Sequence, residues 1–541
     1  MRYFLISLAI SLSASAQQQA ISQDMCAPPP SGTAPSLPAK LLPGQGTIHF
    51  EITTSNAEAQ KFFDQGLNQM HSFWAVEAER SFLQAAQIDP EAAMPWWGVA
   101  MVAAGDYRPR FQLDTANRVF GTNRDPRIVN KRAVDAAEKA QALSAKASDL
   151  EKMYIASIVA RRMPSRVGLA SDEGYIAGLK AIVAKHPKDV EAKTFLALHT
   201  MRGYTLPNHT PKPGTMEAVQ LLREMLVDHP NHAGVHHYVI HGFEGSTFAK
   251  DAWPSCKLYT ELAPNIPHAL HMPGHIYSQT GRWADAAKSF SDAAENELTW
   301  INADKLYGRG HHGHNVHYLS TALSFSGQYD KAIAQAQHLL EFKENPREAA
   351  QIDGFFNVYR QGWFAMLRAL VQSERWDEIL TGSLLPNYGK PREQIWRHWA
   401  RGIAYAAKGD ANNAILESKE MDAAMKDFND KVKRAPTAEL QTARLELDAH
   451  IAAATGRSKR ALNVFKKAMD KERAMVYSEP PYYPRPVAIP LGNYALKLNK
   501  RERAAEAFRI ALEQYPASFQ AENGLRSATD PGTKTVNADG Q

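Results

Sequence analysis

Apolar residues recur at intervals of three and four positions along most of the chain, as in IPLGNYALKLNKRERAAEAFRIALEQYP, residues 489–516. This spacing places apolar side chains on one face of an α-helix. Alternating strand patterns are few, and many stretches are rich in Ala. The pattern predicts an all-α fold over residues 53–527. Residues 17–52, rich in Pro, Gly and Ser, are predicted to be a linker that cannot pack a core, and residues 528–541 a disordered tail.

The same arrangement of small and aromatic residues occurs near both ends of the helical region. FFDQGLNQMHSFWAVEAERSFLQAAQIDP (62–90) and residues 489–516 each contain Gly, Ala, Phe, Ala and Pro. Counted from the Gly, the other four residues follow after about 12, 16, 19 and 24 positions in both segments, which is the grid of a 34-residue repeat. Further segments fall on the same grid: 274–294, 324–340, 401–415 and 450–472.

On these residues the chain resembles the tetratricopeptide repeat (TPR) proteins. In that family each repeat is a pair of antiparallel helices, and successive pairs stack into a superhelix. The resemblance implies one continuous TPR-type α-α solenoid of at least eight helix pairs. Small residues let the two helices of a pair approach closely, and the aromatic residue fills the space between neighbouring pairs.

The N-terminus reads MRYFLISLAISLSASAQQQ, with one Arg, a short apolar run and the small residues Ala14, Ser15 and Ala16. These are the parts of a secretory signal peptide, predicted over residues 1–16. No later stretch has the ~18 consecutive apolar residues that a membrane-spanning helix needs. We therefore expect an exported bacterial protein without a membrane span, periplasmic or secreted.

Charge and cysteine content narrow the function further. The chain has 62 basic and 57 acidic residues, a balance that argues against nucleic acid as a partner. Cys26 and Cys256 are the two cysteines. An oxidising compartment permits a disulfide between them, and the sequence leaves their pairing open. Thiolate ligation of a metal is poorly supported, so any metal site would use histidines and carboxylates.

Twelve of the 20 histidines lie between residues 229 and 317. The segment HALHMPGHIY, residues 268–277, holds three of them at spacings of three and four. On the 34-residue grid, the repeats of residues 229–340 place seven histidines at positions 2, 5 or 9 of a first helix. That face of the helix lines the concave groove in TPR proteins. The predicted metal ligands are His237, His241, His268, His271, His275, His314 and His317, with Glu244 and His232 as further candidates.

The register places His237 above His271 and His241 above His275, so two ligands from each of two packed helices would share an ion. A lone histidine on a helix face is usually structural. The prediction of a metal site depends on sets of histidines at the same positions of successive repeats. Two other interpretations stay open: a groove that hydrogen-bonds a polar or anionic ligand, and a pH-sensitive surface. Pro273 argues against an unbroken helix here and suggests that the helix starts at residue 272 or 273.

Several segments also look like one subgroup of exported bacterial TPR proteins that carries the pattern H-x-x-H-M-P-x-H-I. They are residues 93–107, 232–244, 268–283, 313–319 and 479–492. The resemblance implies the same seven histidines as motif positions, and it supplies no reaction.

Three functions follow from these observations. The first is a TPR protein with a transition-metal site in its groove that is catalytic; the second is a metal storage or handling module. The third is a scaffold that binds a peptide or protein partner without metal. Motifs of conventional enzymes are absent from the sequence. Nitrogen ligands suit Zn, Cu, Ni or Fe, and export favours Zn or Cu.

Overall fold

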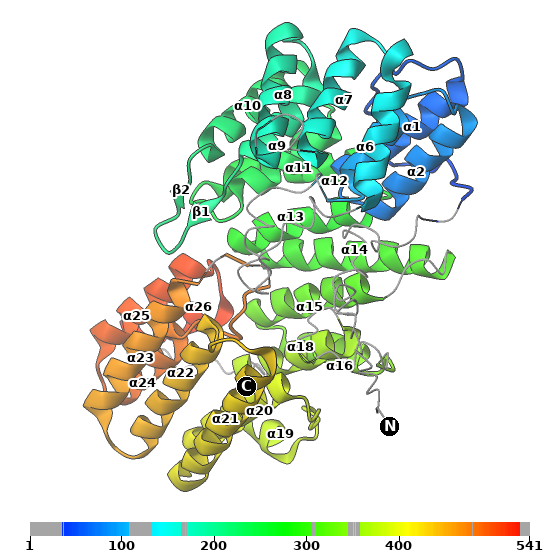
Figure 1. The fold of residues 1–541 in the computed structure, drawn as a ribbon. Helices are drawn as coiled ribbons and strands as arrows, with labels where there is room; N and C mark the ends of the chain where they lie inside the picture. Colours follow the sequence, from blue (N-terminus) through cyan, green and yellow to red (C-terminus); the bar gives the residue numbers. More distant parts are fainter. Residues whose placement is uncertain are drawn as a thin grey trace, which may run out of the picture.

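The computed structural model describes residues 37–105, 131–163, 170–303, 309–344, 357–475 and 480–530, together with residues 35, 107, 168, 350, 352, 477 and 478. In these residues nearly all regular structure is helical, and successive helices pack as antiparallel pairs along a curved solenoid (Figure 1). The predicted all-α solenoid is thereby confirmed. The helices are α1 Ala57–His71, α2 Ala75–Ile88, α3 Met94–Val102, α6 Lys131–Leu143, η1 Ser144–Lys146, α7 Asp149–Arg162, α8 Ser171–Lys185, α9 Val190–Thr200, α10 Thr215–Asp228, α11 Ala233–Phe243, η3 Ala249–Ala252, α12 Trp253–Leu262, α13 Pro267–Gln279, α14 Trp283–Ala303, α15 Gly310–Phe325, α16 Tyr329–Leu340, α18 Val358–Gln372, α19 Trp376–Thr381, α20 Pro391–Ala407, α21 Ala411–Val432, α22 Ala438–Ala454, α23 Ser458–Arg473, α24 Ala488–Lys497, α25 Arg501–Gln514 and α26 Phe519–Thr529.

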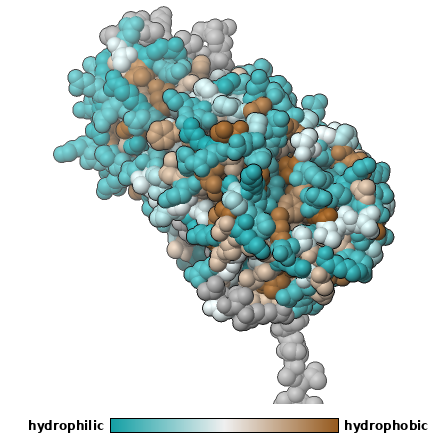
Figure 2. All heavy atoms as spheres, turned by 90° about the horizontal axis from the view of Figure 1, so that it is seen from above, coloured by the Kyte–Doolittle hydropathy of each residue, from teal (hydrophilic) through white to brown (hydrophobic). Residues whose placement is uncertain are grey.

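A short antiparallel hairpin, β1 Tyr204–Thr205 and β2 Thr210–Pro211, is the sheet found in the described residues. None of the described helices is long and apolar enough to cross a membrane. The face of the molecule in Figure 2 is largely hydrophilic, with its hydrophobic residues in separate patches.

The glycine and phenylalanine of the predicted repeat grid lie directly against each other. A Cβ atom on Gly274 would lie 2.4 Å from the ring of Phe290, and one on Gly492 would lie 2.7 Å from the ring of Phe508. Phe508 also lies against Gly524 of the next helix, so the ring fills the space between neighbouring pairs. This packing confirms the role that the grid assigned to these residues.

Residues 37–52, which the composition assigned to a linker, are instead packed against the N-terminal repeats. Ile48 and Ile52 are buried in the core of the N-terminal repeats. The Ile48 N–H donates to Asn68 Oδ1 at 3.0 Å, and the Leu42 N–H donates to Gln65 Oε1 at 2.7 Å. Buried amides of α1 thus satisfy the backbone of a segment that has no helix or strand of its own.

The ends of the solenoid fold back onto its middle. The Trp283 indole donates to the backbone oxygen of Pro516 at 2.9 Å, which joins the start of α14 to the turn after α25. Gly281 has φ +75°, and a Cβ atom there would lie 2.6 Å from the same oxygen. At the other end, the Asn265 N–H donates to Gly44 O at 3.0 Å. The central repeats are therefore enclosed by both ends.

One local expectation is corrected. The helix of HALHMPGHIY does not start at residue 272 or 273: α13 begins at Pro267, and Pro273 lies inside it. Pro267 takes the first turn, where a missing N–H costs nothing. Helix α14 runs to Ala303. Cys256 is buried in the core, whereas Cys26 and the predicted signal peptide lie outside the described residues.

Candidate metal centre

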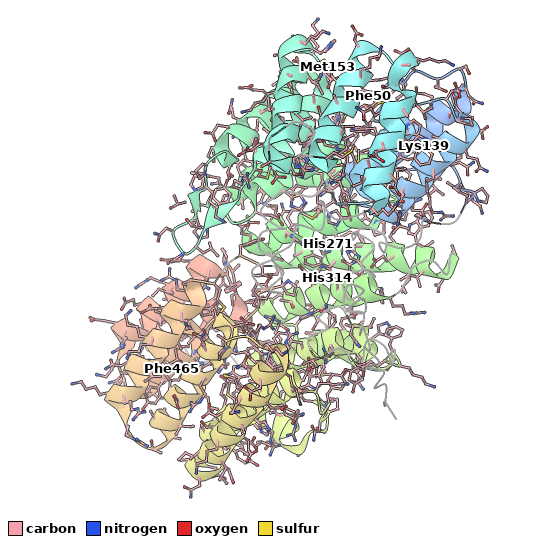
Figure 3. The ribbon with its side chains drawn as sticks, viewed as in Figure 1. Phe50, Lys139, Met153, His271, His314 and Phe465 are labelled. Atoms are coloured by element: carbon pink, nitrogen blue, oxygen red, sulfur yellow. The ribbon has the colours of Figure 1, made fainter. Side chains whose placement is uncertain are left out.

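The central histidines come from α11, α13 and α15, the first helices of three successive pairs. Figure 3 shows His271 and His314 close together in the middle of the solenoid. Their rings stack with centroids 5.3 Å apart, which joins α13 to α15. His232 caps α11, its Nδ1 accepting from the Val235 N–H at 3.1 Å, and this fixes where the first of the three helices begins.

Three of the predicted ligands form a compact triad: His237, His241 and His268. One ligand atom from each lies within 4.8 Å of those from the other two. The ring centroids of His237 and His241, one turn apart on α11, are 4.7 Å apart, and that of His268 on α13 is 5.0 Å from that of His237. Phe73 covers the triad, with its ring 4.4 Å from that of His237 and 5.2 Å from that of His268.

Oxygen acceptors fix which ring nitrogen of the triad faces inward. His237 Nδ1 donates to the backbone oxygen of His71 at 2.5 Å. His241 Nδ1 donates to Glu244 Oε2 at 2.5 Å. A carbonyl and an ionised carboxylate only accept, so both rings carry a proton on Nδ1, and in the neutral form of each ring Nε2 holds the lone pair. Metal-ligating histidines are typically held in this way.

Glu244 joins two repeats. Its Oε2 accepts from His241 of α11, and its Oε1 accepts from His275 Nδ1 of α13 at 2.5 Å. Burial by itself raises the pKa of Glu244, but the positive charge and hydrogen bonds of the two imidazoles outweigh it and lower the pKa to about 2. The residue is therefore ionised at neutral pH. Both of its oxygens are occupied, so it orients histidines rather than serving as the metal ligand that the sequence suggested.

His271 and His275 form a second group, the His271–His275 pair. His271 Nδ1 donates to Asn315 Oδ1 at 2.6 Å, and His275 Nδ1 donates to Glu244. Asn315 Nδ2 donates to Glu297 Oε2 at 2.8 Å, which sets the orientation of its amide. The two Nε2 atoms then face each other at 2.7 Å, a hydrogen-bond distance, so in the metal-free chain one proton lies between them. Two neutral acceptors at this distance repel each other unless a proton or a metal cation lies between them.

Three residues near the pair were not predicted: His311, Asn315 and Glu297. His311 Nδ1 hydrogen-bonds Glu297 Oε1, and its ring lies 5.3 Å from that of His314. His311, His314 and Asn315 share one face of α15 at spacings of three and four, a signal present in the sequence. Glu297 lies on the second helix of the preceding pair, and the first-helix register gave no indication of it.

Three predicted histidines fall outside both groups: His314, whose ring stacks on that of His271, and His317 and His232. His317 Nδ1 donates to Gln361 Oε1 at 2.6 Å, and its ring lies against Phe364 on α18. His232 Nε2 contacts Glu191 Oε1 at 2.8 Å, so it is part of a buried network with His71. The expected register is corrected in one half: Glu244 links His241 to His275 as the register places them, whereas the histidine of α13 next to His237 is His268 and not His271.

The histidines are more enclosed than an open concave groove would make them. His237 is 0% exposed and His275 is 9% exposed, while His268 and His314 are partly exposed. Burial lowers the pKa values of His237, His268 and His271 well below the usual range, so these rings are neutral at pH 7. Helix α1 and the residues after it fold back over α11, and Phe73 from this segment covers the triad.

Comparisons with known proteins place the chain near TPR structures. No family model matches it, and no curated protein matches it in sequence. A tetratricopeptide repeat protein from Parabacteroides merdae shows 16% identity and a TM-score of 0.33, covering 64% of this chain and 98% of its own. Yeast Tom70 shows 11% identity and a TM-score of 0.26, covering 88% and 89%. With TM-scores this low, the fold of this chain is defined by its own helix pairs.

Proposed function

We propose that the protein binds transition-metal ions at the triad of His237, His241 and His268 and at the neighbouring His271–His275 pair. One observation carries the proposal. Four histidines, His237, His241, His271 and His275, donate Nδ1–H to oxygen acceptors, and ligand atoms of neighbouring imidazoles lie close together in both groups. His71, outside both groups, instead contacts Tyr238 and Glu191 through its two nitrogens.

The spacing of the nitrogens suits an ion. Metal–nitrogen bonds of roughly 2.0–2.1 Å at a tetrahedral angle put two ligating nitrogens about 3.3 Å apart. The triad nitrogens lie within 4.8 Å of one another, and the two nitrogens of the pair are 2.7 Å apart. Small side-chain rotations would bring both groups to ligation distance, and a metal cation would take the place of the shared proton within the pair.

The ligand set favours Zn or Cu, with Fe and Ni as further possibilities, because neutral imidazoles suit all four ions. Three nitrogens at the triad leave one tetrahedral position open, as in catalytic zinc sites. A storage or handling module would instead fill every position with protein ligands. The partial exposure of His268 gives a small molecule a route to the triad. The proposal includes the predicted export, because the protein would acquire Zn or Cu in the periplasm or outside the cell.

The alternative is a TPR scaffold that binds a peptide or protein partner without metal. In that function histidines would line an accessible groove, and burial of His237, His241 and His271 argues against it for this face. The scaffold function would have to use other surfaces.

The test is metal analysis of the mature protein produced without a polyhistidine tag. We expect Zn or Cu in the purified protein, and stoichiometric rebinding after dialysis against a chelator. X-ray absorption at the metal edge should show imidazole nitrogens, and its coordination number distinguishes an open site from a filled one. A chain that arrives without metal and takes up none on titration would contradict the proposal.

A further inference from the structure

A cavity of about 370 Å³ lies where the central repeats meet the C-terminal repeats. Trp283, Tyr318 and Phe325 line it from α14 and α15, and Glu472, Gln514 and Tyr515 line it from α23, α25 and the turn after α25. The hydrogen bond from Trp283 to Pro516 holds the two sides together. Such a volume suits a small molecule.

Aromatic rings form much of the wall. Trp283 stacks on Phe325 with ring centroids 4.7 Å apart, and Phe325 stacks on Tyr515 at 4.6 Å. Tyr318 lines the cavity and stacks on His275 with centroids 5.4 Å apart and planes 4° apart. The cavity is therefore next to the His271–His275 pair, and one tyrosine ring separates the two.

The polar groups of the lining include acceptors in need of a donor. Glu472 is buried, and its Oε1 accepts from Gln514 Nε2 at 2.8 Å. Glu472 Oε2 and Gln514 Oε1 are buried and have no hydrogen-bond partner among the residues that the structure describes. Burial raises the pKa of Glu472 to about 8, because hydrogen bonds and the charge of Arg473 offset its desolvation only in part.

The remaining charges of the lining compensate each other. Arg473 Nη2 lies 3.3 Å from Glu513 Oε2, so these two form an ion pair at the exposed edge. Glu472 makes no ion pair with any described residue. The cavity thus combines aromatic faces with one buried acid that forms no ion pair, because the neighbouring Arg473 is paired with Glu513 and offsets the burial of Glu472 only in part.

We propose that this cavity binds an organic amine in its protonated form, with its ammonium group at Glu472 and Gln514 and its carbon skeleton against the aromatic rings. An ammonium supplies N–H donors for the two unsatisfied oxygens, and its charge converts Glu472, which its raised pKa keeps largely protonated at neutral pH, to the carboxylate. Aromatic faces attract cations through the ring quadrupole, in addition to burying apolar surface. The inference does not depend on the proposed metal site, because none of these residues belongs to it.

The experiment compares three probes of similar shape on chelator-treated protein by titration calorimetry: 2-phenylethylamine, 2-phenylethanol and 3-phenylpropionate. We expect the amine to bind at least tenfold more tightly than the neutral alcohol and the acid. Glu472→Gln, which keeps the shape and removes the charge, should lose that preference. Glu513→Gln, at the edge of the same cavity, should leave it within twofold of the wild type.

Thermal unfolding followed by circular dichroism establishes that each variant is folded. Should Glu472→Gln fail to fold, Gln514→Met removes the second acceptor and should weaken amine binding with little effect on the alcohol. Equal binding of amine and alcohol, absence of binding by all three probes, or full amine affinity in the folded Glu472→Gln variant would overturn the inference. Since the protein is metal-free throughout, these outcomes are independent of the proposed metal site.

Discussion

The Nε2 atoms of His271 and His275 lie 2.7 Å apart while both Nδ1 atoms donate to oxygen. The two histidines lie one turn apart on α13. The acceptors of their Nδ1–H groups are Asn315 of α15 and Glu244 at the end of α11. This relationship gives the central repeats an arrangement that an added cation would stabilise, and it determines the first prediction.

Replacing His271 and His275 together by Ala should lower the amount of metal bound. A ligand that binds only the folded chain stabilises it by about 2.7 kcal/mol at a hundredfold excess over Kd. Metal should therefore raise the melting temperature of the wild type by a few degrees and that of the variant by less. The control replaces the exposed His229 and His338 by Ala. Equal metal content in all three proteins would show that the pair is not a ligand.

Glu244→Gln should weaken metal binding without removing a ligand. The carboxylate accepts from both His241 and His275, whereas an amide has one accepting oxygen and turns its NH2 group toward the other ring. Loss of such a partner typically lowers metal affinity by about 10–100-fold. Competition with a chromophoric chelator measures the change. Glu261→Gln, exposed on α12, is the matched control, and an unchanged affinity in Glu244→Gln would be evidence against the assigned tautomers.

The stability of the metal-free chain should fall with pH through His317. Burial, with a contribution from Arg368, lowers the pKa of His317 to about 3. The unfolded chain takes up this proton near pH 6.5, well above the folded chain. The contribution of His317 to stability is therefore complete above pH 6.5 and is lost as the pH falls toward 3.

By pH 5 this group alone should account for about 2 kcal/mol, because one pKa unit corresponds to about 1.4 kcal/mol. Urea unfolding at pH 7 and pH 5 checks the loss. His317→Gln, which cannot titrate, should lose less stability over this interval than the wild type, and His229→Gln should follow the wild type. Parallel losses in wild type and His317→Gln would contradict the assignment.

Gly274→Ala should destabilise the chain by about 1–3 kcal/mol through overpacking. The new Cβ atom would lie 2.4 Å from the Phe290 ring, which also contacts His271 and Tyr318. Gly492→Ala produces the same conflict with Phe508, far from the histidines. Both variants should lower the urea midpoint, and Gly274→Ala alone should also weaken metal binding. Equal metal affinity in the two variants would show that the packing of Gly274 against Phe290 does not affect the metal site.

Sequence reasoning reached the solenoid because the repeat is a local pattern: Gly274 and Phe290 meet at a fixed spacing within one helix pair. It led to His237, His241, His268, His271 and His275 because they occur at fixed positions of α11 and α13. It did not reach the pairing of His237 with His268, since the register treats neighbouring helices as parallel and aligned. It also missed Glu297, which lies on the second helix of a pair, and Asn315, whose side chain lies between His271 and Glu297.

The repeat grid could not predict that the site is enclosed. Phe73 covers the triad because the N-terminal repeats curl back onto α11, and a repeating pattern carries no information on contacts between distant repeats. The Pro-rich composition of residues 17–52 likewise hid the apolar Ile48 and Ile52, whose burial depends on α1 being next to them.

The hydrogen bond from Trp283 to Pro516 spans 233 residues of sequence. In an ordinary repeat array each unit contacts only its neighbours, so folding can begin anywhere and spread along the chain. Here the start of α14 acquires its acceptor only when the turn after α25 exists. The high contact order of this closure means that the central repeats complete their packing last, after nearly the whole chain has left the ribosome. Assembly of the buried histidines is thereby tied to completion of the polypeptide.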